Sequence, residues 1–338
     1  MPEPDVILVL RVVILTGIIC ALISWLLVRY SIQAIPNRRS AHQVPTATAG
    51  GLALIIAVGA GVMVLGVKID NSLLHVVLGL SGMSAALGFI DDVREVPAKL
   101  KFGLLGLVSL IAAFYLGPVN VLPLDGIKLQ LPWLLAMAGT GLWVFTMVNS
   151  VNFMDGGDGV VPLSSLVATV GMLVLAVLFE NWLVFWLTLL LMSGLIGFLP
   201  FNTPKARLFL GDTGSLFIGA WLAANALLLI QEGPESVVWL MPLMFMPYLS
   251  DVLLTMAWRL RQRHNLLQAH NDHLYQLAIK SGQPHIRVAL SLSVQIGLSS
   301  FLAILLHGSA TSAFLGFVAS AIFALLVHWQ LRHTRKAQ

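Results

Sequence analysis

The stretch GVVPLSSLVATVGMLVLAVLFENWLVFWLTLLLMSGLIGFL, residues 159–199, decides the fold of this protein. It contains a single charged side chain, Glu180, which divides it into apolar segments at 159–179 and 182–199. A helix needs about 20 residues to cross the roughly 30 Å hydrocarbon core of a bilayer. Each segment therefore has the length of a membrane-spanning helix, and the polar connection between the two is very short.

The same pattern extends over the whole chain of 338 residues, of which 58% are hydrophobic and 10% are charged. Soluble proteins carry about 25% charged residues, so this composition excludes a cytosolic globular enzyme, a disordered chain and a nucleic-acid-binding domain. We expect an all-α integral membrane protein, a polytopic bundle that forms one domain over residues 1–338. Its predicted helices number about eleven, with ten to twelve also compatible; the other nine stretches are 6–28, 50–67, 73–90, 102–117, 131–148, 214–230, 237–256, 288–306 and 309–330.

Basic residues predict the orientation of this bundle. With the N-terminus outside, sixteen of the 19 Lys and Arg residues fall on the inner side, and the outer loops hold only Lys68 and Lys128. This asymmetry follows the enrichment of Lys and Arg in cytoplasmic loops. An odd number of helices then places the C-terminus in the cytoplasm. The outer connection near 119–131 has Asp125-Gly126 between two alternating segments, which predicts a small periplasmic β-hairpin.

Most of the aspartates lie on the inner side. Asp91 and Asp92 are adjacent at the end of a predicted helix, where they repel each other and meet the negative end of the helix dipole. A bound cation, or neighbouring basic residues such as Arg94 and Lys99, would offset this cost. A solvated helix terminus is the alternative interpretation of the pair.

The string NSVNFMDGGDG, residues 149–159, ends another apolar helix. Asn149, Asn152 and Asp155 are spaced by three and share one helical face, and Asp158 follows after two glycines. Amide groups directed into hydrocarbon cost free energy unless they are satisfied. The string therefore indicates a binding site rather than an ordinary loop.

The string FNTPKARLFLGDTGS, residues 201–215, begins the next helix with Asp212 between two glycines. This position brings backbone N–H groups and a carboxylate suited to a metal together. Asn202 and Phe209 are suited to a planar base, through hydrogen bonds and stacking respectively. A capped helix start explains Asp212 alone but not the whole string.

Two further inner loops are basic. The loop at 36–51 contains Arg38 and His42, which either anchor the helix end or bind an anion. The loop at 257–287 contains His270 and His273, spaced by three, together with several arginines. An amphipathic helix on the anionic leaflet is one interpretation. Phosphate binding fits the histidines better than zinc, because no third ligand follows at a known spacing.

In this order the strings resemble the polyprenyl-phosphate N-acetylhexosamine-1-phosphate transferases, glycosyltransferase family 4. The sequence AHNDHLYQ at 269–276 looks like the pattern of the O-antigen-initiating branch, although Asn271 stands where that branch has arginine. The resemblance implies three groups of site residues. They are the catalytic and metal-binding carboxylates Asp91, Asp92 and Asp212; the uridine-binding residues Asn152, Asp155, Asp158, Asn202 and Phe209; and the phosphate- or sugar-binding residues Arg38, His42, His270 and His273.

The resemblance also implies a function. A UDP-sugar would donate N-acetylhexosamine-1-phosphate, with GlcNAc, QuiNAc or FucNAc as the sugar, to undecaprenyl phosphate and release UMP. Mg²⁺, or alternatively Mn²⁺, would assist at the cytoplasmic face of a bacterial inner membrane, in O-antigen, lipopolysaccharide or related cell-envelope synthesis. The implied partners are both substrates and the lipid bilayer, without nucleic acid, and a homodimer is left open. The alternatives are a lipid transporter or flippase, a polyprenyl-pyrophosphate phosphatase and an inactive scaffold.

Overall fold

The computed structural model describes residues 3–30, 33–34, 46–65, 72–268 and 270–334. Within these ranges almost all regular structure is helical, as predicted. The helices are α1 (Val6–Tyr30), α2 (Gly50–Val64), α3 (Ser72–Val93), α4 (Ala98–Leu116), α5 (Trp133–Met154), α6 (Val160–Leu178), α7 (Trp182–Asn202), α8 (Gly211–Glu232), α9 (Val237–Met244), α10 (Met246–Arg261), α11 (Leu274–Lys280), α12 (His285–Leu305) and α13 (Ala310–Thr334). The strands are β1 (Gln33–Ala34), β2 (Thr46–Ala47), β3 (Val121–Leu124) and β4 (Ile127–Gln130).

The protein is an all-α polytopic membrane protein. In the described ranges, nine helices are long and apolar enough to cross a membrane, and the bent pair α9–α10 makes a tenth. The predicted stretch 50–67 forms the shorter helix α2, which has 15 residues. At 1.5 Å per residue α2 is roughly 22 Å long, less than the hydrocarbon core. The eleven predicted stretches therefore correspond to nine long helices, the bent pair α9–α10 and the shorter helix α2.

The predicted helix 237–256 is two helices, and a single straight span is wrong here. α9 and α10 meet at Phe245 with a bend of 69°. Pro247 lies in the first turn of α10. It has no N–H to donate, and its ring would clash with the carbonyl of Leu243 in a continuous helix. The chain therefore changes direction at this point.

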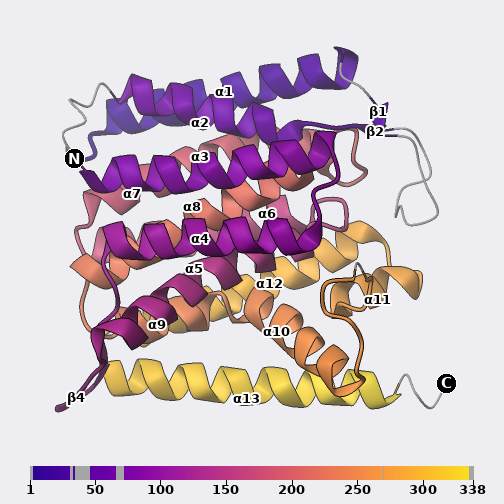
Figure 1. The fold of residues 1–338 in the computed structure, drawn as a ribbon. Helices are drawn as coiled ribbons and strands as arrows, with labels where there is room; N and C mark the ends of the chain where they lie inside the picture. The colour runs from indigo at the N-terminus through magenta and orange to yellow at the C-terminus, as the bar shows by residue number, and fades with distance from the viewer. Residues whose placement is uncertain (1–2, 31–32, 35–45, 66–71, 269, 335–338) are drawn as a thin grey trace.

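Helix α8 is the centre of the bundle (Figure 1). In the most apolar 18-residue stretch of α8, 94% is buried, whereas in that of the peripheral helix α13 the share is 11%. Small residues allow the neighbouring helices to approach α8 closely. A Cβ at Gly219 would lie 2.8 Å from the Cα of Val148 on α5. Such small-residue contacts are typical of helices packed within membranes.

The two ends of the bundle differ in character (Figure 1). The start of α1 and the predicted hairpin lie at one end. In this hairpin β3 and β4 pair antiparallel around Asp125-Gly126, with Gly126 in the left-handed region at φ 79°. The other end, here called the basic end, carries the β1–β2 pair, α11 and the end of α13. It also carries the described Lys and Arg residues of the predicted inner loops. The basic residues that are scattered along the sequence therefore lie together at one end of the bundle.

Candidate active site

Two carboxylates from distant parts of the chain share one cation at the basic end. Asp91 lies in the last turn of α3, Asp212 in the first turn of α8, and Lys101 in the first turn of α4. The Lys101 Nζ is 2.7 Å from the Asp91 Oδ2 and also forms an ion pair with Asp212. The ammonium is largely enclosed. Two carboxylates against one ammonium leave a net negative charge, which favours a further cation.

Asn152 orients the Asp212 carboxylate. The Asn152 Nδ2 donates to the Asp212 Oδ1 at 2.9 Å, and it also lies 2.9 Å from the Ser215 Oγ. The Val96 N–H donates to the Asp91 Oδ1 at 2.7 Å and holds that carboxylate in the same way. Both predicted metal ligands are therefore fixed by hydrogen bonds that come from outside their own helices.

Asp92 has a different task from its neighbour Asp91. Its carboxylate accepts the backbone N–H groups of Asp212 and Thr213, each at 2.9 Å, and the Thr213 hydroxyl at 2.6 Å. These N–H groups begin α8, whose own N-cap residue provides no side-chain cap. A carboxylate here satisfies orphan donors and complements the positive end of the helix dipole. With three donors on it, the Asp92 carboxylate positions the first turn of α8, and its predicted catalytic role stays a prediction.

Two glycines allow α3 to lie against the start of α8. A Cβ at Gly88 would clash with the backbone carbonyl of Asp212. Gly211 has φ 72°, in the left-handed region, and a Cβ there would lie 2.8 Å from the Asp92 Oδ2. The close approach of the two helices, and hence the cap by Asp92, requires glycine at both positions.

A cavity of about 330 Å³ lies beside the carboxylates. Its walls come from the ends of α3 and α5, the start of α4, residues 266–268, His270 and His273, and α11. Five predicted site residues and the bridging lysine line it: Asp91, Lys101, Asn152, Asp155, His270 and His273. The structure therefore brings together strings that are more than 100 residues apart in the sequence.

Asp155 faces this cavity from the end of α5. Burial, followed by the negative charges of Asp212, Asp92 and Asp158, raises its pKa well above the ordinary value of an aspartate. Within the described residues its carboxylate has no hydrogen-bond donor. A carboxyl group in this state is ready to accept or donate a hydrogen bond to a bound polar molecule.

The two histidines differ in setting. His273 is 2% exposed and stacks between Phe153 and Tyr275, with ring centroids 5.8 and 6.2 Å away. Burial, with the neighbouring positive charges of His273 and Arg259, lowers the pKa of His270 to about 4. His270 is therefore neutral near pH 7, so it offers a substrate a hydrogen bond rather than a charge.

Asp251 and Lys101 are the site residues that sequence reasoning missed. Buried Asp251 accepts the N–H groups of Leu274 at 2.8 Å and Tyr275 at 3.2 Å, so it caps α11, and its Oδ1 is 3.6 Å from the His273 Nδ1. An acid within an apolar stretch was the available signal. For Lys101 no signal existed, because a lysine at a helix start looks like any membrane anchor.

Three residues predicted to bind uridine lie outside the cavity lining. The Asp158 Oδ2 accepts the Ala206 N–H at 3.1 Å. The buried Asn202 accepts from the Gly159 N–H at 2.8 Å and donates to the Leu208 carbonyl at 2.9 Å. Both ends of its amide are thus bonded to the backbone, which braces the segments on either side of Asn202.

Phe209, the third of these residues, joins the two sides of the site through its backbone. Its N–H donates to the Ala47 carbonyl at 2.9 Å, and its own carbonyl accepts from the Gly50 N–H at 2.9 Å. The uridine contacts of all three residues stay predictions. Arg38 and His42 lie outside the described residues, and their predicted phosphate contacts also stay predictions.

Comparison with known proteins points to one family. The profile of glycosyl transferase family 4 matches residues 74–230. Over 299 residues the chain is 26% identical to a probable undecaprenyl-phosphate N-acetylglucosaminyl 1-phosphate transferase of Bacillus subtilis, covering 88% of this chain and 82% of that protein. These similarities support a place for the chain in the polyprenyl-phosphate hexosamine-1-phosphate transferase family. The span matched by the family profile includes Asp91, Lys101, Asn152 and Asp212, whereas the histidine loop lies beyond it.

Other relatives cover different shares of the chain. A decaprenyl-phosphate N-acetylglucosaminephosphotransferase of Mycolicibacterium smegmatis is 27% identical over 336 residues, covering 86% of this chain and 81% of that protein. A phospho-N-acetylmuramoyl-pentapeptide-transferase of Listeria welshimeri is 35% identical over 174 residues, covering 47% of this chain and 52% of that protein. Similarity to relatives with different named substrates therefore extends over different shares of the chain.

Proposed function

We propose that this protein transfers an N-acetylhexosamine-1-phosphate from a UDP-sugar to undecaprenyl phosphate and releases UMP. The observation that carries the proposal is that Asp91 and Asp212 both form ion pairs with the Lys101 ammonium. This cluster lies beside a cavity that Asp155 and two histidines also line. The names of the relatives support the class of reaction. The site lies at the basic end, which the distribution of Lys and Arg assigns to the cytoplasm.

The donor set fits Mg²⁺. Among the described residues no group of three His, Cys, Asp or Glu side chains forms a ready metal site. Mg²⁺ is commonly held by one or two carboxylates together with substrate phosphates. Asp91 and Asp212 would supply the two carboxylates, at the place where their charges already meet the Lys101 ammonium. When bound, the cation would neutralise charge on the diphosphate and the developing charge of the reaction.

The reaction itself exchanges one phosphoanhydride bond for another. An oxygen of the lipid phosphate forms a bond to the sugar-proximal phosphorus, the bond between the two donor phosphates breaks, and UMP leaves with that electron pair. A phosphomonoester with a second pKa near 6 is mainly dianionic at neutral pH, so a general base is not required. Catalysis is then chiefly positioning and charge neutralisation.

The residues of this chain divide these tasks. Lys101 balances the charge of the two carboxylates, and the third N–H of its ammonium can donate to a phosphate oxygen. Asn152 orients Asp212, and Asp92 fixes the first turn of α8. Neutral His270 offers a hydrogen bond to a sugar or phosphate oxygen. Each role follows from a contact in the site rather than from a position in the sequence.

The wider setting follows from the pattern of the histidine loop. We place the enzyme in the bacterial inner membrane, at the first membrane step of O-antigen, lipopolysaccharide or a related envelope polysaccharide. The sugar is GlcNAc or a 6-deoxy relative such as QuiNAc or FucNAc. Because the acceptor is a membrane lipid, the cavity must be reached from the bilayer as well as from the aqueous side.

The test is UMP release by purified protein with undecaprenyl phosphate, Mg²⁺ and a panel of UDP-sugars. We expect turnover with at least one sugar and a loss of roughly a hundredfold or more in Asp212→Asn. Glu95→Gln, which changes an exposed acid just after the end of α3, is the matched control and should keep wild-type turnover. Lipid movement without UMP release by the wild-type protein would refute the transferase and favour a transporter.

A further inference from the structure

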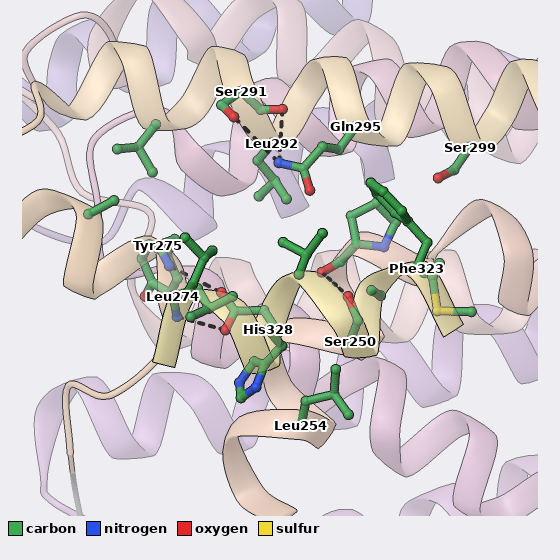
Figure 2. Close-up of a pocket in the computed structure, with 18 of the residues that line it drawn as sticks. Ser250, Leu254, Leu274, Tyr275, Ser291, Leu292, Gln295, Ser299, Phe323 and His328 are labelled. Carbon is green, nitrogen blue, oxygen red and sulfur yellow. Dashed lines mark hydrogen bonds between the residues drawn. The ribbon is translucent and has the colours of Figure 1, made fainter. Parts of the chain in front are cut away.

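A second cavity, of about 560 Å³, lies between α10, α12 and α13 (Figure 2). Tyr275 lines both this cavity and the one at the active site. The α9–α10 pair is bent by 69°, and both of its helices pack against α12 and α13 around this space. Pockets of about 300–1,000 Å³ are the usual size for small-molecule ligands. The proposed transferase reaction does not use this cavity.

The cavity lies at membrane depth and opens sideways. Its lining on α12 runs from Arg287 to Leu302, which is roughly 22 Å along the helix axis. Ser291 on α12 and Phe323 on α13 line it and are exposed, so it opens between these two membrane-spanning helices. Its natural surroundings are therefore the acyl chains and headgroups of the bilayer rather than water.

The lining is apolar at depth and cationic toward the basic end. Leu298, Leu302 and Phe323 line the deep part. At the basic end the Arg287 Nη1 donates to the Gln283 Oε1 at 2.8 Å. A guanidinium has five N–H donors, and within the described residues this is the hydrogen bond that Arg287 makes. The remaining donors are available to an anion.

Polar groups continue a short way down the same wall. The Gln295 Nε2 donates to the Ser291 carbonyl at 3.3 Å, so this amide presents its own carbonyl oxygen to the cavity (Figure 2). Asp251 is the acidic side chain among the lining residues, and its oxygens already accept the N–H groups of α11. The exposed Arg287 guanidinium therefore lies at one end of the cavity, above its apolar part, whereas the negative charge of Asp251 is buried against the start of α11.

We propose that this cavity binds one anionic phospholipid of the bilayer. The phosphate lies at Arg287, the glycerol region lies near Ser291, and one acyl chain lies along Leu298 and Phe323. Charge complementarity at the basic end and the apolar depth together select this occupant over a zwitterionic lipid. The site goes beyond the proposed function and does not depend on it.

The position of the site gives the lipid a structural effect. Leu274 and Tyr275, the first residues of α11, form part of the cavity wall. The Tyr275 hydroxyl donates to the Phe153 carbonyl at 2.7 Å, and Phe153 lines the active-site cavity. A bound chain therefore packs directly against the helix that supports the histidine wall.

The experiment is a native mass-spectrometry titration of the full-length protein in detergent, with phosphatidylglycerol as the probe and phosphatidylcholine as the reference. We expect one tightly bound phosphatidylglycerol per chain and weaker phosphatidylcholine binding. Arg287→Gln should reduce the preference for phosphatidylglycerol about fivefold. Ser299→Trp fills the slot from α12 and Ala324→Phe fills it from α13, and each should weaken binding about tenfold.

Leu290→Trp is the matched control, because Leu290 is an exposed α12 residue that does not line the cavity. It should bind phosphatidylglycerol as the wild-type protein does. Melting temperature and gel filtration show which variants are folded. Ser299→Trp and Ala324→Phe lie on different helices, so they test the cavity independently. Equal affinity for both lipids in the wild-type protein, or full binding by both filled variants, would overturn the proposal. Displacement of the bound lipid by equimolar undecaprenyl phosphate would also overturn it, since the acceptor would then be the occupant.

Discussion

Replacing Lys101 by methionine tests how the two carboxylates are held together. Met has a similar length but no charge, so Asp91 and Asp212 would face each other without a shared cation. At an effective dielectric constant of about 20, opposite charges roughly 3 Å apart attract by about 5–6 kcal/mol before desolvation. Loss of one partner of a buried ion pair costs about 3–5 kcal/mol. Because the Asp212 side chain is 33% exposed, we expect the lower end, about 3 kcal/mol.

A divalent cation should restore much of this loss. Binding at one hundred times the dissociation constant stabilises a folded protein by about 2.7 kcal/mol. In the wild-type protein the cation must first displace the Lys101 ammonium, so the gain should be smaller. Lys101→Met should therefore melt well below wild type in EDTA and recover in Mg²⁺, and its Mg²⁺-induced shift should exceed that of the wild-type protein. Reversible thermal melting in detergent, with and without Mg²⁺, measures both effects.

The control for this experiment is Lys99→Met, on the exposed side of the same helix turn. It should melt like the wild-type protein in both buffers. If Lys101→Met were as stable as Lys99→Met in EDTA, the ammonium would not be holding the carboxylates. If Mg²⁺ raised the melting temperature of wild type and Lys101→Met equally, the cation would bind elsewhere, and the assignment of Asp91 and Asp212 as its ligands would be wrong.

Three further predictions concern the supports of the site. Asp92→Ala removes the cap of α8 and should cost about 0.5–2 kcal/mol in thermal unfolding; it should also slow UMP release, and an unchanged rate would contradict the positioning role. Tyr275→Phe removes the hydrogen bond to the Phe153 carbonyl, so it should cost about 1 kcal/mol and increase hydrogen exchange in α11. His270 has a folded pKa of about 4, below its unfolded value near 6.5, so its neutral form stabilises the fold fully above pH 6.5. Wild type should lose stability relative to His270→Gln as the pH falls from 6.5 to 4, and parallel melting curves over that range would refute the shift.

Hydropathy predicted most of the fold because it is a local property. The hairpin at Asp125-Gly126 was equally readable, since a two-residue turn with glycine in the left-handed region is encoded by adjacent residues. The bend at Phe245 was not predicted, although Pro247 was visible. Membrane helices often accommodate proline, because neighbouring helices satisfy the freed backbone groups. Only packing decides whether such a helix kinks slightly or breaks.

The candidate site shows the same limit more sharply. Local polar strings pointed to Asp91, Asn152, Asp155 and Asp212, because polar side chains at helix ends in an apolar chain require a reason. The strings could not distinguish residues that face a cavity from those that brace the scaffold. Asn202 belongs to the second group in this structure, with both ends of its amide bonded to backbone.

The sequence by itself determined that the chain crosses a membrane repeatedly and that most of its aspartates lie on the inner side. Both conclusions rest on the cost of burying charge in hydrocarbon, which depends on composition and spacing alone. Only the tertiary structure decided that Lys101 joins two acids and that Asp92 caps α8. The contacts of Asp212 with Lys101 and with Asp92 each link residues more than 100 positions apart. Such contacts depend on how the helices pack around α8, and no local pattern encodes that packing.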